Sequence, residues 1–346
     1  MTDRYDRQVR FFGAEGQRRI ADAHVVALGC GGLGMHVIQQ FAYLDAQRWT
    51  LVDDDDVDDT SINRMVGATP EDVGTAKVDI AARLVRGLHP MATIDRIRGR
   101  VGDPEIADRL IQALAEADLD FGCFDMETPR LHTTKLCSDI GVPYVDAATD
   151  IFEEDGQLVY GGRMVVAHDG TGCVACLGVL DQVGLARERM TPTQRAEHDR
   201  IYGVDRGDLD GSGPSVVMLN GAVASLAATE AMVFLTGIRE PNRQLTYRAH
   251  MGNVGRDLSK GDPDCAYCAT GVHTERAPGP ARGPRPRRPA GAASGHPRGV
   301  AAAVGQSHSS LADPRPPSPT PGAPHRGSRR RRPAGEQADG PWPHQR

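Results

Sequence analysis

The stretch AHVVALGCGGLGMHVIQQFAYL, residues 23–44, predicts a strand, a glycine-rich turn and a helix, in that order. Glycine lets a backbone turn tightly and approach a phosphate, and the helix that follows offers that phosphate unpaired N–H groups and a positive dipole end. A Rossmann-like nucleotide-binding fold is therefore expected. The turn alone does not distinguish a dinucleotide from ATP. Its glycines are Gly29, Gly31, Gly32 and Gly34.

A second strand follows about twenty residues later, as in dinucleotide-binding folds. The stretch RWTLVDDDDV, residues 48–57, predicts a strand that ends at Asp53. A carboxylate in this place can accept hydrogen bonds from a ribose. This feature, too, fits any user of a dinucleotide or of ATP.

The next segment, residues 60–90, contains Asn63, Arg64 and Lys77 before a predicted helix. A dehydrogenase does not need these cations. They suit a reaction in which negative charge grows on the α- and β-phosphoryl oxygens as pyrophosphate leaves. A solvated helix start is the alternative interpretation of an isolated arginine and lysine.

Residues 116–150 predict a strand, a turn, a helix and another strand, with Asp125 at the carboxyl end of the first strand. Ligands bind at the carboxyl ends of parallel strands, where a carboxylate can hold Mg²⁺ on phosphates. The alternative is that Asp125 caps the helix that follows it.

Two C-x-x-C pairs lie far apart in the chain, in CVACLG (173–178) and DPDCAYCATG (262–271). Four thiolates from two such pairs satisfy a tetrahedral zinc and leave no open position for water or substrate. We therefore expect a structural Zn²⁺ that joins the two segments. Its expected ligands are Cys173, Cys176, Cys265 and Cys268.

The composition places a boundary near residue 270. Residues 271–346 hold 13 arginines and 4 acidic residues, a net charge of +9, although the whole chain carries −6. This segment is rich in proline and lacks apolar periodicity, so a disordered tail is expected. Its arginine run could bind nucleic acid, but a solvated extension is the favoured interpretation. No apolar leader or run of 18 apolar residues is present, so we expect a cytoplasmic protein without a membrane span.

Taken together, six elements resemble the ubiquitin-activating-enzyme-like superfamily, specifically the bacterial ThiF/MoeB/HesA adenylyltransferases. The resemblance runs in order from residue 4 to about residue 268. It implies a homodimer that uses ATP and Mg²⁺ to adenylate the C-terminal glycine carboxylate of a small ubiquitin-like or sulfur-carrier protein. The elements are RYDRQ (4–8), GCGGLG (29–34), LVDDDDVDDTSINR (51–64), DVGTAK (72–77), FDM (124–126) and the two C-x-x-C pairs.

The resemblance also implies roles for individual residues. Arg7 is similar to an arginine that reaches a phosphate across the dimer interface, and Asp125 matches the aspartate associated with Mg²⁺. Ser61, Met65 and Met126 depart from the family pattern, which weakens the expectation for nucleotide affinity more than for the fold. The implied catalytic residues are Arg7, Arg64, Lys77 and Asp125, and the implied ATP ligands are Gly29, Gly31, Gly32, Gly34, Asp53, Asp55, Asn63, Arg64 and Lys77.

The expected organisation is an adenylyltransferase domain over residues 1–270 and the tail over 271–346. Within the domain we expect a helical segment (1–22), a nucleotide-binding half (23–150) and a carrier-binding half (151–270) with a crossover loop at about 179–214. Residues 157–170 and 243–252 predict antiparallel strands that extend the sheet. Residues 215–237 are apolar on all sides, which predicts a buried helix.

No cysteine lies between Cys176 and Cys265, so we expect adenylation without a thioester on the crossover loop. The remaining cysteines, at positions 30, 123 and 137, are interpreted as buried core residues. Any sulfur donor or conjugating partner would be a separate protein. Three alternatives stay open: an NAD-dependent oxidoreductase, a nucleotide-binding module without catalysis, and an adenylyltransferase that acts on a free peptide or an RNA-linked carboxylate.

Overall fold

The computed structural model describes residues 4–154, 156–168, 170, 172–191, 193–194 and 214–269. The chain divides into two units, Met1–Arg288 and Pro289–Arg346, and every described residue belongs to the first unit. The tail expected at 271–346 and the middle of the expected crossover loop lie outside these residues.

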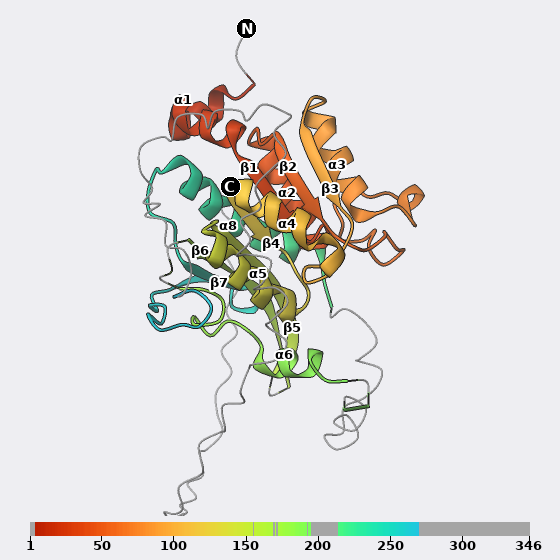
Figure 1. The fold of residues 1–346 in the computed structure, drawn as a ribbon, viewed down its shortest axis with the longest axis vertical. Coiled ribbons are helices and arrows are strands. Elements are labelled where there is room, and N and C mark those ends of the chain that lie inside the picture. Colours follow the sequence, from red (N-terminus) through yellow and green to blue (C-terminus); the bar gives the residue numbers. More distant parts are fainter. Residues whose placement is uncertain are drawn as a thin grey trace, which may run out of the picture. The chain divides into compact units, whose positions relative to one another are not determined.

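A mixed sheet organises the described part of the chain (Figure 1), in which eight strands follow the order β3-β2-β1-β4-β5-β6-β7-β8. The pairs from β3 to β5 are parallel, and the pairs from β5 to β8 are antiparallel. The predicted α/β class, with a parallel sheet extended by antiparallel strands, is confirmed. The strands are β1 (His24–Leu28), β2 (Arg48–Val52), β3 (Thr93–Ile97), β4 (Leu119–Gly122), β5 (Tyr144–Glu154), β6 (Gln157–Ala167), β7 (Gln244–Arg248) and β8 (Asn253–Asp257).

Helices pack on both faces of the sheet. Alternate residues of β1 belong to two different apolar clusters, because successive side chains of a strand point to opposite faces. Helices α2, α3 and α8 contribute to one cluster, and α4 and α5 contribute to the other. The helices are α1 (Asp6–Asp22), α2 (Gly32–Tyr43), α3 (Lys77–Leu88), α4 (Pro104–Glu116), α5 (Glu127–Ile140), α6 (Gln182–Glu188) and α8 (Val217–Thr236), with short 3₁₀ turns at Pro70–Asp72 and Ala249–Met251.

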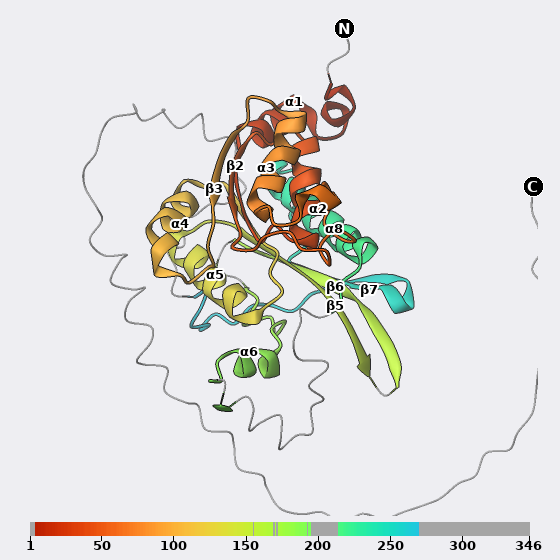
Figure 2. The ribbon, with the colours of Figure 1, turned by 90° about the vertical axis from the view of Figure 1, so that its right-hand side faces the viewer.

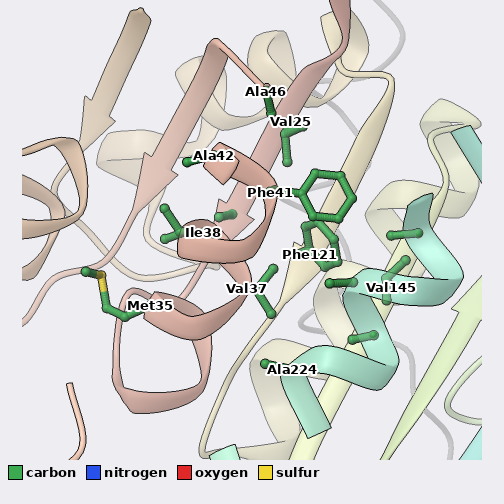
Figure 3. Close-up of a cluster of buried hydrophobic side chains, with 14 of the residues drawn as sticks. Val25, Met35, Val37, Ile38, Phe41, Ala42, Ala46, Phe121, Val145 and Ala224 are labelled. Atoms are coloured by element: carbon green, nitrogen blue, oxygen red, sulfur yellow. The ribbon is translucent and has the colours of Figure 1, made fainter. Parts of the chain in front are cut away.

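The larger cluster centres on α2, whose apolar face lies between the sheet and α8 (Figure 3). The rings of Phe41 and Phe121 meet edge to face, with centroids 5.0 Å apart. Such a pair contributes about 0.5–1.5 kcal/mol beyond its area burial. This packing fixes α2, and therefore the glycine turn that precedes it, against β1 and β4.

Helix α8 is long and apolar enough, by length and composition alone, to cross a membrane. It packs against α2, β5 and β6, and it buries the polar residues Asn220 and Glu230. The Glu230 carboxylate accepts hydrogen bonds from Arg239 at 2.7 and 2.8 Å. These contacts are those of a core helix, as the sequence predicted.

The order of the strands places a topological switch point between β1 and β4. The chain leaves β1 toward β2 on one side and returns through β4 on the other. Ligands of open α/β sheets bind at the carboxyl ends of the strands at such a point. Beyond it, β5 and β6 continue together as a long hairpin that projects past the helices (Figure 2).

Asp120 in β4 is a carboxyl group without solvent exposure. Burial raises its pKa to about 8, against the bond from the Cys137 thiol, which lowers it. In the unfolded chain, Asp120 has its ordinary pKa of about 3.9 and loses its proton above that pH. Between about pH 4 and pH 8 the folded chain therefore holds a proton that the unfolded chain has released, so the free energy of unfolding falls as the pH rises through this range.

We expect Asp120→Asn to remove this pH dependence. The difference in the free energy of unfolding between the variant and the natural chain should increase, in favour of the variant, by about 1.4 kcal/mol for each pH unit between pH 5 and 8. Urea titrations at several pH values measure it. Asp118→Asn, which changes an exposed carboxylate of the same segment, serves as the control. Parallel curves for the natural chain and Asp120→Asn would contradict the prediction.

Candidate active site

The glycine turn is closely packed on one side and open on the other. Gly29 has a φ of +94°, and a methyl group on it would lie 2.5 Å from the carbonyl oxygen of Cys123. A methyl group on Gly34 would lie 1.9 Å from the carbonyl oxygen of Gly29, whereas one on Gly31 would meet nothing within 4 Å. The open side faces the start of α2, where the first N–H groups lack acceptors within the helix. A phosphate fits this arrangement.

Substitutions at two of these glycines should therefore have different effects. Gly34→Ala forces a methyl group onto backbone atoms, so we expect a loss of about 3 kcal/mol or more in stability. Gly31→Ala should leave the melting temperature nearly unchanged but weaken ATP binding, because its methyl group would occupy the space in which a phosphate would lie. Thermal unfolding and calorimetric ATP titration measure the two effects. Equal effects of the two substitutions on stability would contradict the prediction.

The Asp53 carboxylate follows β2 directly and ties it to the glycine turn. Asp53 accepts hydrogen bonds from the backbone N–H of Cys30 at 2.6 Å and of Asp55 at 2.9 Å. Burial raises the pKa of Asp53, although both of these bonds lower it. Each carboxylate oxygen accepts one of these bonds, so lone pairs remain for the hydroxyls of a ribose.

Lys77 begins α3 and joins the same cluster. Its Nζ lies 2.7 Å from Oδ2 of Asp55, and its side chain is only 13% exposed. Burial alone would lower the pKa of Lys77, but the bond to Asp55 and the nearby carboxylates outweigh it, so the pKa is raised. Asp125 is one of those carboxylates. The charge of Asp125 thus acts on Lys77 although the two residues are 48 positions apart in the sequence.

The stem of Arg64 lies against the glycine turn. A methyl group on Gly32 would come within 3.1 Å of Cγ of Arg64. The guanidinium donates to the carbonyl of Thr60, and Asn63 beside it is exposed.

Two departures from the family pattern lie next to Arg64. The Ser61 hydroxyl donates to Asp58 at 2.7 Å, so it supports the local turn. Met65 is 3% exposed and packs in the core. Both side chains thus stabilise the fold of this segment.

Asp125 is exposed in the turn between β4 and α5. The helix cap is Met126, and no side chain caps the helix from that position, so the alternative interpretation of Asp125 as the cap is wrong. Arg130 donates to the carbonyl of Phe124, directly before Asp125. Arg130 therefore holds the turn that carries Asp125, a contact that the sequence analysis missed.

Arg130 itself belongs to a buried charge network under α5. Its guanidinium lies 2.8 Å from Asp146, and Arg163 lies 2.6 Å from the other oxygen of that carboxylate. The Tyr144 hydroxyl also donates to Asp146, at 2.8 Å. Burial would raise the pKa of Asp146, but the two guanidinium groups lower it below its ordinary value. The network fixes β5 against α5.

The start of α5 is capped by a residue from the expected crossover loop. The Glu188 carboxylate, at the end of α6, accepts hydrogen bonds from the backbone N–H of Glu127 at 2.8 Å and of Thr128 at 2.7 Å. A carboxylate at a helix N-terminus is stabilised by the helix dipole. This contact anchors α6 beside the turn of Asp125.

Arg7 lies apart from the other predicted residues. Gln8 beside it donates to the carbonyl of Tyr43, at the far end of α2 from the glycine turn. Twelve residues of helix separate these two ends, or about 18 Å, which an arginine side chain does not span. Arg7 instead lines an open groove of about 670 Å³ with Phe11, Tyr43 and Met232. Phe11 and Tyr43 are 67% and 58% exposed.

The two C-x-x-C pairs meet in space. The Sγ atom of Cys173 lies 3.8 Å from those of Cys176 and Cys265, and the Sγ atoms of Cys176 and Cys268 are 3.8 Å apart. All four sulfur atoms lie within 4.8 Å of one another. Segments 92 residues apart in the chain are thereby brought together.

A glycine turn, an aspartate after the second strand, two cations and a further aspartate at the switch point define a nucleotide-binding α/β protein. Residues 5–267 match the ThiF family, and the chain belongs to that family. The resemblance to the ubiquitin-activating-enzyme-like superfamily, in its ThiF/MoeB type, is thus confirmed.

Relatives agree with this family. The SAMP-activating enzyme E1 of Haloferax volcanii is 30% identical over 273 residues, which cover 78% of this chain and 89% of that protein. The molybdopterin-synthase adenylyltransferase of Escherichia coli is 27% identical over 269 residues, 77% of this chain and 95% of that protein. A crystal structure of E. coli MccB with ATP is 22% identical and has a TM-score of 0.59 over 78% of this chain and 75% of that chain, which shows a common fold.

Proposed function

We propose that this protein is an ATP-dependent adenylyltransferase that activates the C-terminal glycine carboxylate of a small ubiquitin-like or sulfur-carrier protein. The observation that supports the proposal is the glycine turn at the switch point, with Asp53 bonded to its backbone, the stem of Arg64 against Gly32 and the Lys77–Asp55 pair beside it. The relatives' names, which include adenylyltransferases and an activating enzyme, support the same reaction. We expect the protein to act in the cytoplasm.

In the proposed reaction, a carboxylate oxygen of the carrier attacks the α-phosphorus of ATP. The bond from this phosphorus to the bridging oxygen breaks, and pyrophosphate leaves with the electron pair. The turn's N–H groups hold phosphate oxygens, while Arg64 and Lys77 neutralise the charge that grows there. Asp53 binds the ribose. No nucleophile from the protein is required.

Asp125 is our candidate for holding Mg²⁺. Its carboxylate is exposed, is one of the charges that raise the pKa of Lys77, and offers the oxygen donors that Mg²⁺ prefers. When bound, the ion would neutralise phosphate charge. Asp125 would orient the ion, and Arg130 holds the backbone of this turn in place.

A structural zinc fits the four cysteines. Sulfur atoms placed 2.3 Å from a tetrahedral metal are about 3.8 Å apart, and three of the sulfur distances in this cluster have that value. The cluster is also largely buried. We propose that Zn²⁺ bound here joins the segment after β6 to the segment after β8.

The remaining cysteines do not favour a thioester intermediate. Burial raises the pKa of the thiols of Cys30, Cys123 and Cys137. A thiol, unlike a thiolate, is a poor nucleophile. We therefore propose that the adenylate is passed directly to a separate sulfur donor or conjugating protein.

We further propose a homodimer in which Arg7 acts on the neighbouring subunit's nucleotide. The exposed aromatic groove around Arg7 is the kind of surface that a partner covers. Because Arg7 cannot reach its own glycine turn, it can serve only a second copy. The arrangement of the two copies would have to bring Arg7 of each to the glycine turn of the other.

Mixing two inactive variants tests this arrangement. Arg7→Ala and Lys77→Ala chains, refolded together, should recover about one quarter of natural activity, because half of the dimers are mixed and each mixed dimer has one intact site. Each variant refolded alone is the control and should stay inactive. Absence of recovery in a mixture shown to contain mixed dimers would contradict action across the interface.

The reaction itself is tested by ATP–pyrophosphate exchange with the purified protein and candidate carriers that end in glycine. Exchange that depends on a carrier and is lost in Asp125→Ala would support adenylation. If ATP binds but neither a carrier, a free peptide nor an RNA-linked carboxylate supports exchange, the nucleotide-binding module is the better interpretation. Binding of NAD in place of ATP would favour the oxidoreductase.

A further inference from the structure

Asn220 is a buried amide in the first turn of α8, next to the glycine turn. Its side chain is 1% exposed within a helix that is otherwise mostly apolar. A buried amide costs free energy unless its polar atoms are bonded. We propose that Asn220 is a positioning residue of the nucleotide site, which keeps the glycine turn and Arg64 at the separation that a triphosphate needs. This inference rests on the proposed use of ATP.

The amide bonds to two segments that lie far apart in the sequence. Its Oδ1 accepts from the Thr149 hydroxyl at 3.2 Å, and its Nδ2 donates to the Ser215 hydroxyl at 3.1 Å. Thr149 belongs to β5, and Ser215 lies two residues before the first residue of α8. Asn220 therefore fixes the start of α8 relative to the sheet.

The same amide lies against the glycine turn. A methyl group on Gly32 would come within 2.5 Å of Nδ2 of Asn220 and within 3.1 Å of Cγ of Arg64. The bare α-carbon of Gly32 thus lies between the amide and the stem of Arg64. A displacement of the amide would move the turn, Arg64 or both.

Packing alone does not explain an amide at this position. Leucine has the same heavy-atom branching and would occupy the site without hydrogen bonds, as apolar residues do elsewhere on α8, including Val223 and Ala227. A bonded polar group instead specifies one arrangement of its neighbours. Reaction rates depend on such arrangements, because a misplacement of about 1 Å can lower a rate by about a hundredfold.

Calorimetric ATP·Mg²⁺ titration of the full chain at 25 °C tests the inference without a carrier. We expect Asn220→Leu to weaken ATP binding about tenfold, with Ser215→Ala and Thr149→Val each giving part of that loss. Asn220→Asp, which keeps an acceptor for Thr149 and Ser215, should bind more tightly than Asn220→Leu. Ser225→Ala removes an exposed hydroxyl four residues after Gly221 on the same helix and is the matched control.

In exchange assays, the Asn220→Leu loss should appear in the KM for ATP and not in the KM for the carrier. A lower melting temperature with unchanged ATP affinity in all three network variants would show a purely structural role and overturn the inference. Should Asn220→Leu fail to fold, Ser215→Ala and Thr149→Val decide the outcome. If the natural chain does not bind ATP, the proposed function fails. If it binds ATP and the three network variants bind it equally well, only the inference about Asn220 fails, so the two failures are distinguishable.

Discussion

Lys77→Ala should lower kcat/KM for carrier-dependent pyrophosphate exchange on the order of 10³-fold, as the loss of a preorganised charge does in other active sites. The Lys77 side chain is 13% exposed and lies 2.7 Å from Asp55 at the mouth of the glycine turn. In this partly buried place its ammonium interacts with phosphate charge more strongly than it would in water. Asp55 is 53% exposed and can be solvated, so stability should change little.

Lys135→Ala is the matched control for Lys77→Ala. Lys135 also forms an ion pair with an aspartate, Asp139, but on the outer part of α5, where the two side chains are 39% and 37% exposed. We expect less than about a twofold change in exchange, because exposed pairs contribute little. Comparable losses in both variants, or full exchange with Lys77→Ala, would remove Lys77 from the chemistry.

Loss of the cysteine cluster should have the largest effect on stability. Structural zinc contributes about 10–16 kcal/mol of apparent binding energy in small zinc domains, and a link that closes a loop of about 100 residues restricts the unfolded chain by about 4–5 kcal/mol. We expect Cys268→Ser to lower the melting temperature by at least about 10 °C. Thermal unfolding together with zinc analysis by mass spectrometry measures the change.

Cys137→Ala is the control for the cluster, because it removes a buried thiol outside it. It should keep one zinc per chain and lose only about 1–3 kcal/mol, from the small cavity and from the lost bond to Asp120. A natural chain that carries no zinc after growth in zinc-supplied medium, and whose melting temperature a chelator leaves unchanged, would disprove the zinc site.

Much of the nucleotide half was predictable because its signals are local. The glycine turn is continuous in the sequence and is flanked by an apolar strand and a helical pattern, so strand, turn and helix follow directly. Asp53 and Asp125 follow strands, and parallel strands place their carboxyl ends at one edge. The C-x-x-C spacing likewise indicated that the cysteines would meet.

The other contacts depend on partners that no local pattern reveals. Glu188 caps a helix about 60 residues before it, and Arg130 pairs with Asp146 across two elements. The contact between Asn220 and Gly32 depends on the fold, because the two residues lie far apart in the sequence. In a sequence, a glycine and a distant asparagine in an apolar segment occur together too often to predict a contact between them. The distance of Arg7 from its own glycine turn could be judged only after the fold had placed Arg7 at the opposite end of α2.

Two contacts hold the ends of the segment between α6 and α8. Glu188 accepts a hydrogen bond from the start of α5, and Ser215 accepts one from Asn220. Both anchors belong to the part of the chain that the structure describes, so they can be kept while the residues between them are replaced by those of a relative. Such a graft would test whether this segment takes part in the choice of carrier, and ATP binding by the grafted chain is its control.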